Sequence, residues 1–137
     1  MSAKKTQPET DKVVDFLERL HGHSKLIIED ADGTEYTLRY PRAVVKQMES
    51  NGMTADVVAE MASEATSLTT IERLIDEFVY PAFKSDQPKV NKDTVREIYR
   101  SIADKGEFLG LLIGLYTAPV RALTTDPTET RAVFRLA

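Results

Sequence analysis

The chain has 137 residues, of which 42% are hydrophobic and 29% charged, with a formal net charge of −4. This length and composition predict one globular domain with a core of its own. The acidic balance disfavours nucleic acid as the main partner. Because the sequence contains no cysteine, disulfide bonds and thiol catalysis are excluded, and a reducing compartment is expected.

The N-terminal segment is expected to pass from disorder into a helix. Residues 1–9 are polar and include a proline, so they are predicted to be disordered, and they contain no apolar run typical of a secretory signal. Between residues 10 and 21, Val13, Leu17 and Leu20 fall on one helical stripe. This spacing predicts an amphipathic helix.

Residues 25–40 are predicted to form a β-hairpin. Residues 26–28 are the first arm, and Asp32 and Gly33 form a turn in which positive φ angles are tolerated. Two strands alone are marginally stable, so the hairpin is expected to pack on helices or to pair with another chain. Its edge is therefore a candidate contact for self-association.

The second arm of the hairpin alternates in character. Tyr36 and Leu38 are separated by Thr37, and Arg39 follows. Because successive side chains of a strand point to opposite faces, Tyr36 and Leu38 are expected to pack inward on the helices that follow. Thr37 and Arg39 are expected to be exposed.

Pro41 marks the joint between this strand and a helix over residues 42–51. Its fixed φ and its missing N–H suit the first turn of a helix. The pair Asn51–Gly52 is typical of a left-handed helix end, and Thr54 is predicted to cap the next helix.

A regular apolar stripe predicts a third helix over residues 69–83. Thr69 and Glu72 have the spacing of a capping box at its start. Pro81 is expected to kink or end this helix, because proline removes a backbone hydrogen bond. Asn91 is predicted to cap the helix after it.

Residues 107–120, with the sequence EFLGLLIGLYTAPV, are apolar on every side. They are shorter than the roughly 20 residues that span a bilayer, so a buried central helix is predicted and no membrane partner. The spacing of Gly110 and Gly114 permits close approach of a second helix, with packing inside the chain favoured over a subunit contact. The domain is expected to cover residues 10–123, followed by a C-terminal helix or tail over residues 124–137.

These elements predict an α+β fold that is mostly α: a short hairpin, a bundle of about five helices and an extra N-terminal helix. No enzyme, cofactor or metal is expected. His21 and His23 have a spacing compatible with a metal ion, but a helix C-terminus with cationic side chains is the plainer interpretation. The sequence has no glycine-rich phosphate loop and no recognisable nucleophile motif.

Three runs of the sequence follow one another in a recognisable order: DGTEYTLRYPRAVVKQMESNG, IERLIDEFVYPAFKSDQPKV and LLIGLY. Together they resemble the tail assembly chaperones of long-tailed, siphovirus-type bacteriophages over roughly residues 26–118. The positions that carry the resemblance are Asp32, Gly33, Tyr36, Leu38, Val45, Met48, Glu49, Gly52, Leu74, Phe78, Ala82, Phe83, Pro88 and Lys89. The helix at 10–21, the proline at Pro81 and the absence of a histidine before Pro88 depart from the family pattern.

The resemblance implies a protein that binds and solubilises the tape measure protein in the cytoplasm of the infected bacterium. Tail tube protein would displace it, so it is expected to be absent from the mature virion, and self-association is expected. Phe83, Leu112 and Tyr116 are candidate contacts with the client, with a place in the core as the alternative interpretation. Two other functions remain open: a structural tail or neck completion protein of the virion, and a small helical nucleic-acid-binding regulator.

Overall fold

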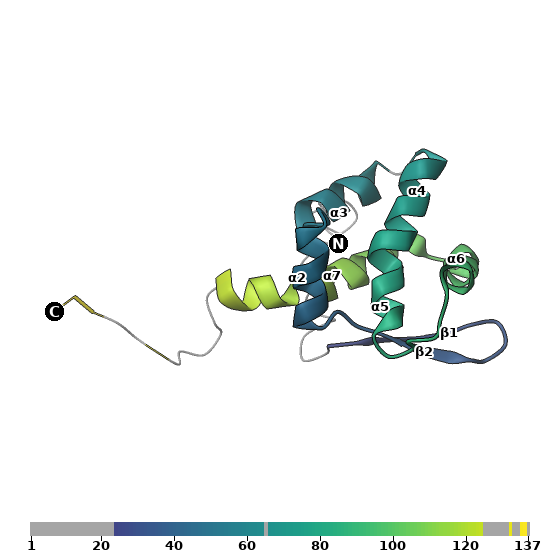
Figure 1. Ribbon diagram of the computed structural model, residues 1–137, viewed down its shortest axis with the longest axis horizontal. Coiled ribbons are helices and arrows are strands. Elements are labelled where there is room, and N and C mark those ends of the chain that lie inside the picture. Colours follow the sequence, from purple (N-terminus) through teal and green to yellow (C-terminus); the bar gives the residue numbers. More distant parts are fainter. Residues whose placement is uncertain (1–23, 65, 125–131, 133–134, 137) are drawn as a thin grey trace, which may run out of the picture.

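The computed structural model describes residues 24–64, 66–124, 132 and 135–136. Within them a two-stranded antiparallel hairpin is followed by a bundle of helices, which confirms the predicted α+β, mostly α class (Figure 1). The elements are β1 (Leu26–Glu29), β2 (Glu35–Leu38), α2 (Arg42–Ser50), α3 (Ala55–Ser63), α4 (Leu68–Leu74), η2 (Ile75–Val79), α5 (Tyr80–Lys84), α6 (Lys92–Ser101) and α7 (Lys105–Thr124). The predictions for residues 1–9 and 10–21, and most of that for residues 124–137, lie outside the described residues.

The hairpin turn forms around Asp32 and Gly33 as predicted, in a loop over residues 30–34 between the paired residues Glu29 and Glu35. Gly33 has a φ of +86°, and the carboxylate of Asp30 accepts hydrogen bonds from the backbone N–H groups of Asp32 and Thr34 at 2.9 and 3.0 Å. This side chain closes the turn in the way typical of aspartate.

The inward side of β2 follows the predicted alternation. Leu38 is fully buried, and Tyr36 is half-buried with its ring edge-on to Phe83 at a centroid distance of 5.6 Å. The predicted exposure of Thr37 and Arg39 is wrong in degree, since both are half-buried.

The reason is that the outer edge of β2 lies against the end of α5. The amide of Gln87 bonds both backbone groups of Thr37, accepting at 2.8 Å and donating at 3.0 Å, as a neighbouring strand would. The N–H of Arg39 donates to the carbonyl of Ala82 at 3.2 Å, and its guanidinium pairs with Asp86 at 2.9 Å.

The predicted helix boundaries at Pro41, Gly52, Thr54 and Asn91 are confirmed. Pro41 precedes α2, and Gly52 follows its end with a φ of +93°. The hydroxyl of Thr54 accepts the N–H of Val57 at 3.3 Å, and Asn91 caps α6 through the N–H of Thr94 at 2.8 Å.

The segments α4, η2 and α5 form one continuous rod (Figure 1). Ser67 caps it by accepting the N–H of Thr70 at 3.1 Å, so the predicted capping box at Thr69 is wrong. Pro81 does not end the helix: the turn before it is π-helical, with the N–H of Tyr80 bonded to the carbonyl of Ile75. This wider turn lets the chain accommodate a proline, which has no N–H and crowds the preceding turn.

The last helix, α7, is longer than predicted and continues through Pro119. It runs behind the other helices, and its C-terminal part projects past α2 (Figure 1). The predicted burial is confirmed for its middle, where Gly114 is buried and Gly110 half-buried, whereas Val120 and Leu123 are exposed. None of the described helices has the length and apolar character that a membrane span requires.

Candidate functional site

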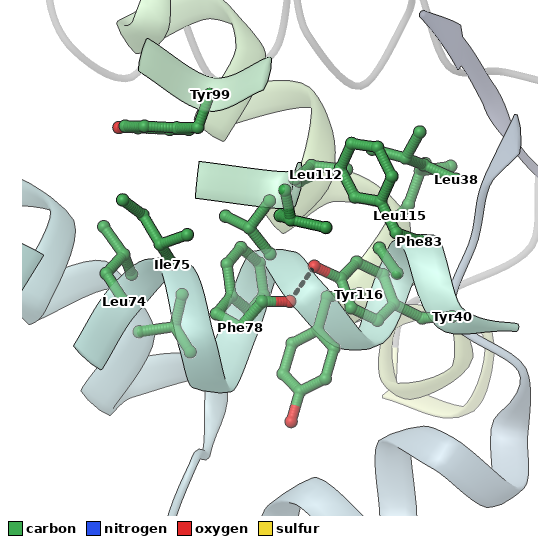
Figure 2. Close-up of a cluster of buried hydrophobic side chains, with 14 of the residues drawn as sticks. Leu38, Tyr40, Leu74, Ile75, Phe78, Phe83, Tyr99, Leu112, Leu115 and Tyr116 are labelled. Atoms are coloured by element: carbon green, nitrogen blue, oxygen red, sulfur yellow. Dashed lines mark hydrogen bonds between the residues drawn. The ribbon is translucent and has the colours of Figure 1, made fainter. Parts of the chain in front are cut away.

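The three predicted client contacts lie in the core. Phe83, Leu112 and Tyr116 are 1%, 0% and 1% exposed (Figure 2). Their prediction as surface contacts is wrong in this structure, and the alternative interpretation as core holds. The physical reason is that α7 is covered along its middle by several elements, so its aromatic and aliphatic side chains are used inside the domain.

Tyr116 is held at the centre of an aromatic cluster. Its ring packs edge-on against Phe78 and Tyr40, at centroid distances of 5.3 and 5.0 Å. Its hydroxyl donates to the backbone carbonyl of Met53. Burial, aided by the negative charge of Glu49, raises the pKa of Tyr116 to about 12.

Tyr40 completes this cluster from the end of the hairpin. It stacks on Phe78 at 5.2 Å, and its hydroxyl donates at 2.7 Å to the Phe78 carbonyl in the π-helical turn (Figure 2). Burial raises the pKa of Tyr40 well above its usual value, with a smaller contribution from Tyr116. Both phenols therefore stay protonated near neutral pH, and the cluster packs as part of the buried core.

The other family-like positions divide by role. The core contains Leu38, Val45, Met48, Leu74, Phe78 and Ala82, whereas Asp32, Glu49, Pro88 and Lys89 are exposed. Gly33 and Gly52 supply the two positive φ angles found among the described residues. Most of the positions that carry the resemblance therefore lie in the core or at turns of the backbone.

Two apolar depressions are lined in part by residues of the α4–η2–α5 rod. The first, the α2–α5 cleft, has a volume of about 480 Å³. Its apolar lining comes from Val44, Met48, Met53, Tyr80 and Pro81, and Glu77 and Lys84 add charges at its edge.

The second depression, the α4–α6 groove, has a volume of about 570 Å³. Its apolar lining is Leu68, Ile71, Leu74, Ile75, Tyr99 and Leu109, and its charged rim is Glu72, Arg96, Arg100 and Lys105. Leu68, at the start of α4, is 71% exposed. Such an exposed apolar surface, rimmed by charge, is typical of a binding site.

Two basic side chains of this rim, Arg96 and Lys105, have different hydrogen-bond partners. The guanidinium of Arg96 makes two bonds to the carboxylate of Asp76, at 2.9 and 2.5 Å, and this hydrogen bonding lowers the pKa of Asp76. The ammonium of Lys105 donates to the carbonyls of Arg100 and Ile102 at the end of α6, at 3.1 and 2.7 Å. No carboxylate within the described part of the chain pairs with Lys105.

The described residues contain no group of three or more His, Cys, Asp or Glu side chains arranged to hold a metal ion. The α4–α6 groove offers an apolar surface with charged side chains at its rim. The outer edge of β2 is occupied by Gln87, so it is closed to strand pairing at Thr37. Within the hairpin, the predicted self-association through an exposed edge would have to use β1.

Comparison with known proteins identifies the family. Residues 23–136 match the family described as Domain of unknown function (DUF5055), and the chain therefore belongs to it. The match covers the hairpin and every described helix, and it excludes the segment before residue 23. No curated protein and no solved structure matches the chain significantly.

The residues of the α4–α6 groove were missed as a site in the sequence, although a signal was present. Ile71, Leu74 and Ile75 belong to the regular stripe that predicted the helix. The core covers only some side chains of this stripe: Leu74 and Ile75 are buried, whereas Ile71 is half-buried. Leu68, at the start of the helix, extends the stripe and is exposed. Which of these positions stays uncovered depends on where α6 and α7 dock, which periodicity does not reveal.

Proposed function

We propose that this protein is a tail assembly chaperone of a long-tailed bacteriophage. It binds the tape measure protein in the cytoplasm of the infected host, keeps it soluble, and is displaced by tail tube protein, so it is absent from the mature virion. Support comes from the order and spacing of the motifs between residues 26 and 118, which resemble that family. Several copies of the chaperone would act along one long client.

The observation that carries the proposal is the open α4–α6 groove. A tape measure protein is long and helical, and an amphipathic helix buries its apolar face in a groove of this kind. Leu68 is largely exposed, so a client helix would contact it at the surface, where another subunit can compete for the client. Phe83, Leu112 and Tyr116 are buried, so we place the contact with the client at this groove.

Co-expression with the tape measure protein of the same phage tests the proposal. We expect the tape measure protein to move from the insoluble to the soluble fraction, and a complex of the two to persist in gel filtration. Equal insolubility with and without this chain, together with no complex, would contradict the proposal. Mass spectrometry of purified particles separates the alternative of a structural tail or neck completion protein, since only that protein is retained in virions.

A further inference from the structure

The α4–α6 groove deepens along one row of side chains. Leu68, Ile71 and Ile75 are spaced by three and four residues on the rod, so they share a face over about 10 Å at a rise of 1.5 Å per residue. Leu68 is exposed, Ile71 is half-buried and Ile75 is buried. The row therefore descends from the surface toward the core.

The walls of the groove determine which backbone conformation fits into it. They are formed by α4, α6 and the start of α7, whose central backbone groups are bonded within their own helices. An extended segment placed there would find few backbone partners for its N–H and C=O groups in apolar surroundings. A helix satisfies its own backbone, and it presents apolar side chains at the same three- and four-residue spacing.

At one end of the groove, the corner between α6 and α7, the lining includes two basic side chains, Arg100 and Lys105. Arg100 pairs with Glu97 at 2.6 Å, but both side chains are largely exposed, at 76% and 67%. An exposed pair of this kind contributes little and exchanges readily for another carboxylate. Lys105 adds a second cation at the same corner, held by the carbonyls at the end of α6.

Arg96, further along the same rim, is already neutralised by Asp76, and Glu72 lies on the opposite rim. The positive charge available to a partner is thus concentrated at Arg100 and Lys105. A carboxylate would be attracted there, and a cation would be repelled.

We propose that the α4–α6 groove binds an amphipathic helix of the partner whose apolar stripe seats on Leu68, Ile71 and Ile75 and whose flank toward the α6–α7 corner is acidic. Only the identity of that partner as the tape measure protein rests on the proposed function. The recognition itself rests on the apolar row, the helical walls and the charge of the corner.

Two synthetic helical peptides of about 18 residues test this recognition. Both carry leucines at positions i, i+3, i+4 and i+7, and they differ in having glutamates or lysines along one flank. With the full chain and fluorescence anisotropy, we expect the glutamate peptide to bind at least about fivefold more tightly than the lysine peptide. Equal affinity, or no binding of either peptide, would overturn the proposal.

Matched variants locate the binding. Leu68→Gln should lower the affinity for the glutamate peptide about tenfold, because apolar contact is lost. Leu123→Gln is the matched control, at a leucine of α7 that is 76% exposed, and it should change that affinity less than about twofold. Arg100→Glu should remove the preference for glutamate, and Lys84→Glu, in the α2–α5 cleft, should preserve it. Equal losses for Leu68→Gln and Leu123→Gln would place the binding elsewhere.

Co-expression and light scattering separate a failure of this recognition from a failure of the proposed chaperone function. If the wild-type chain solubilises the tape measure protein and Leu68→Gln does so equally well, the groove assignment is wrong and the chaperone proposal stands. If the peptide binds as expected but the tape measure protein stays insoluble, the recognition stands and the partner is a different one. If light scattering shows a wild-type dimer that Leu68→Gln dissociates, the groove is occupied by a second copy, and the proposal is wrong.

Discussion

The α4–η2–α5 rod has one apolar face that is closed and another that is open. On the closed face, Phe78 contacts Tyr40 and Tyr116, whose hydroxyls are both satisfied by backbone carbonyls. On the open face, Leu68 and Ile71 border a groove with charge at its rim. The same helical periodicity produced both faces, so an apolar stripe predicts a helix, while elements distant in the sequence decide which part of it remains available for binding.

Phe78→Ala should give the largest effect, because it removes a fully buried ring from the closed face. We expect a loss of about 3–5 kcal/mol in the free energy of unfolding, measured by urea denaturation. Leu123→Ala is the control and should change the free energy by less than about 0.5 kcal/mol, since that side chain is mostly exposed. Comparable losses for the two variants would mean that the aromatic cluster is not the centre of stability.

Tyr116→Phe tests the polar part of the closed face. The Met53 carbonyl would lose its hydrogen bond from the tyrosine hydroxyl in a buried position, which should cost about 1–2 kcal/mol. The matched change Tyr36→Phe, at a half-buried ring on β2, should cost less than about 0.5 kcal/mol. Denaturation curves of both variants give the comparison, and a larger effect at Tyr36 would contradict it.

Asp76→Asn tests the ion pair beside the open face and should have a smaller effect, below about 1 kcal/mol at pH 7, because Arg96 is partly in solvent. The Arg96 hydrogen bond lowers the pKa of Asp76 in the folded state. The stabilisation is therefore present above the unfolded pKa of about 3.9, and it is lost as the pH falls through the lower folded value.

Urea denaturation of the wild type and of Asp76→Asn at several pH values measures this dependence. The stability difference between them should shrink as the pH falls from about 4 toward 2. A difference that stays constant across this range would show that the carboxylate charge of Asp76 does not contribute through Arg96.

Leu68→Gln should have the smallest effect on folding. The side chain is mostly in solvent and at the first position of α4, so the free energy of unfolding should change by less than about 0.5 kcal/mol. Urea denaturation measures it beside Phe78→Ala. A loss above about 1 kcal/mol would mean that the open face is part of the core.

Local chemistry predicted much of this fold. The turn at Gly33, the helix start after Pro41 and the end at Gly52 each depend on the backbone preferences of one or two residues, and each was confirmed. The covering of Thr37 was not predictable in this way, because Gln87 is 50 positions away in the chain. The same holds for Tyr116, whose place in the core is set by Met53 and the end of the hairpin.

The site was predicted less well than the fold, for a related reason. Large apolar side chains such as Phe83 are equally suited to a core and to a binding surface, and composition does not distinguish the two. The groove exists because no described element packs over Leu68, and this depends on how the helices dock in the folded domain.

The π-helical turn at Ile75–Val79 has a consequence for the phase of the rod. A turn with one more residue than an α-turn rotates everything after it by about 100° relative to a regular helix. The rod therefore acts as two short helices out of phase, with α4 beside α3 and α5 beside β2. Deleting one residue from this turn would restore a regular helix but would swing Ala82 and Phe83 away from the hairpin, so the chain length of this turn is as much a part of the fold as its side chains.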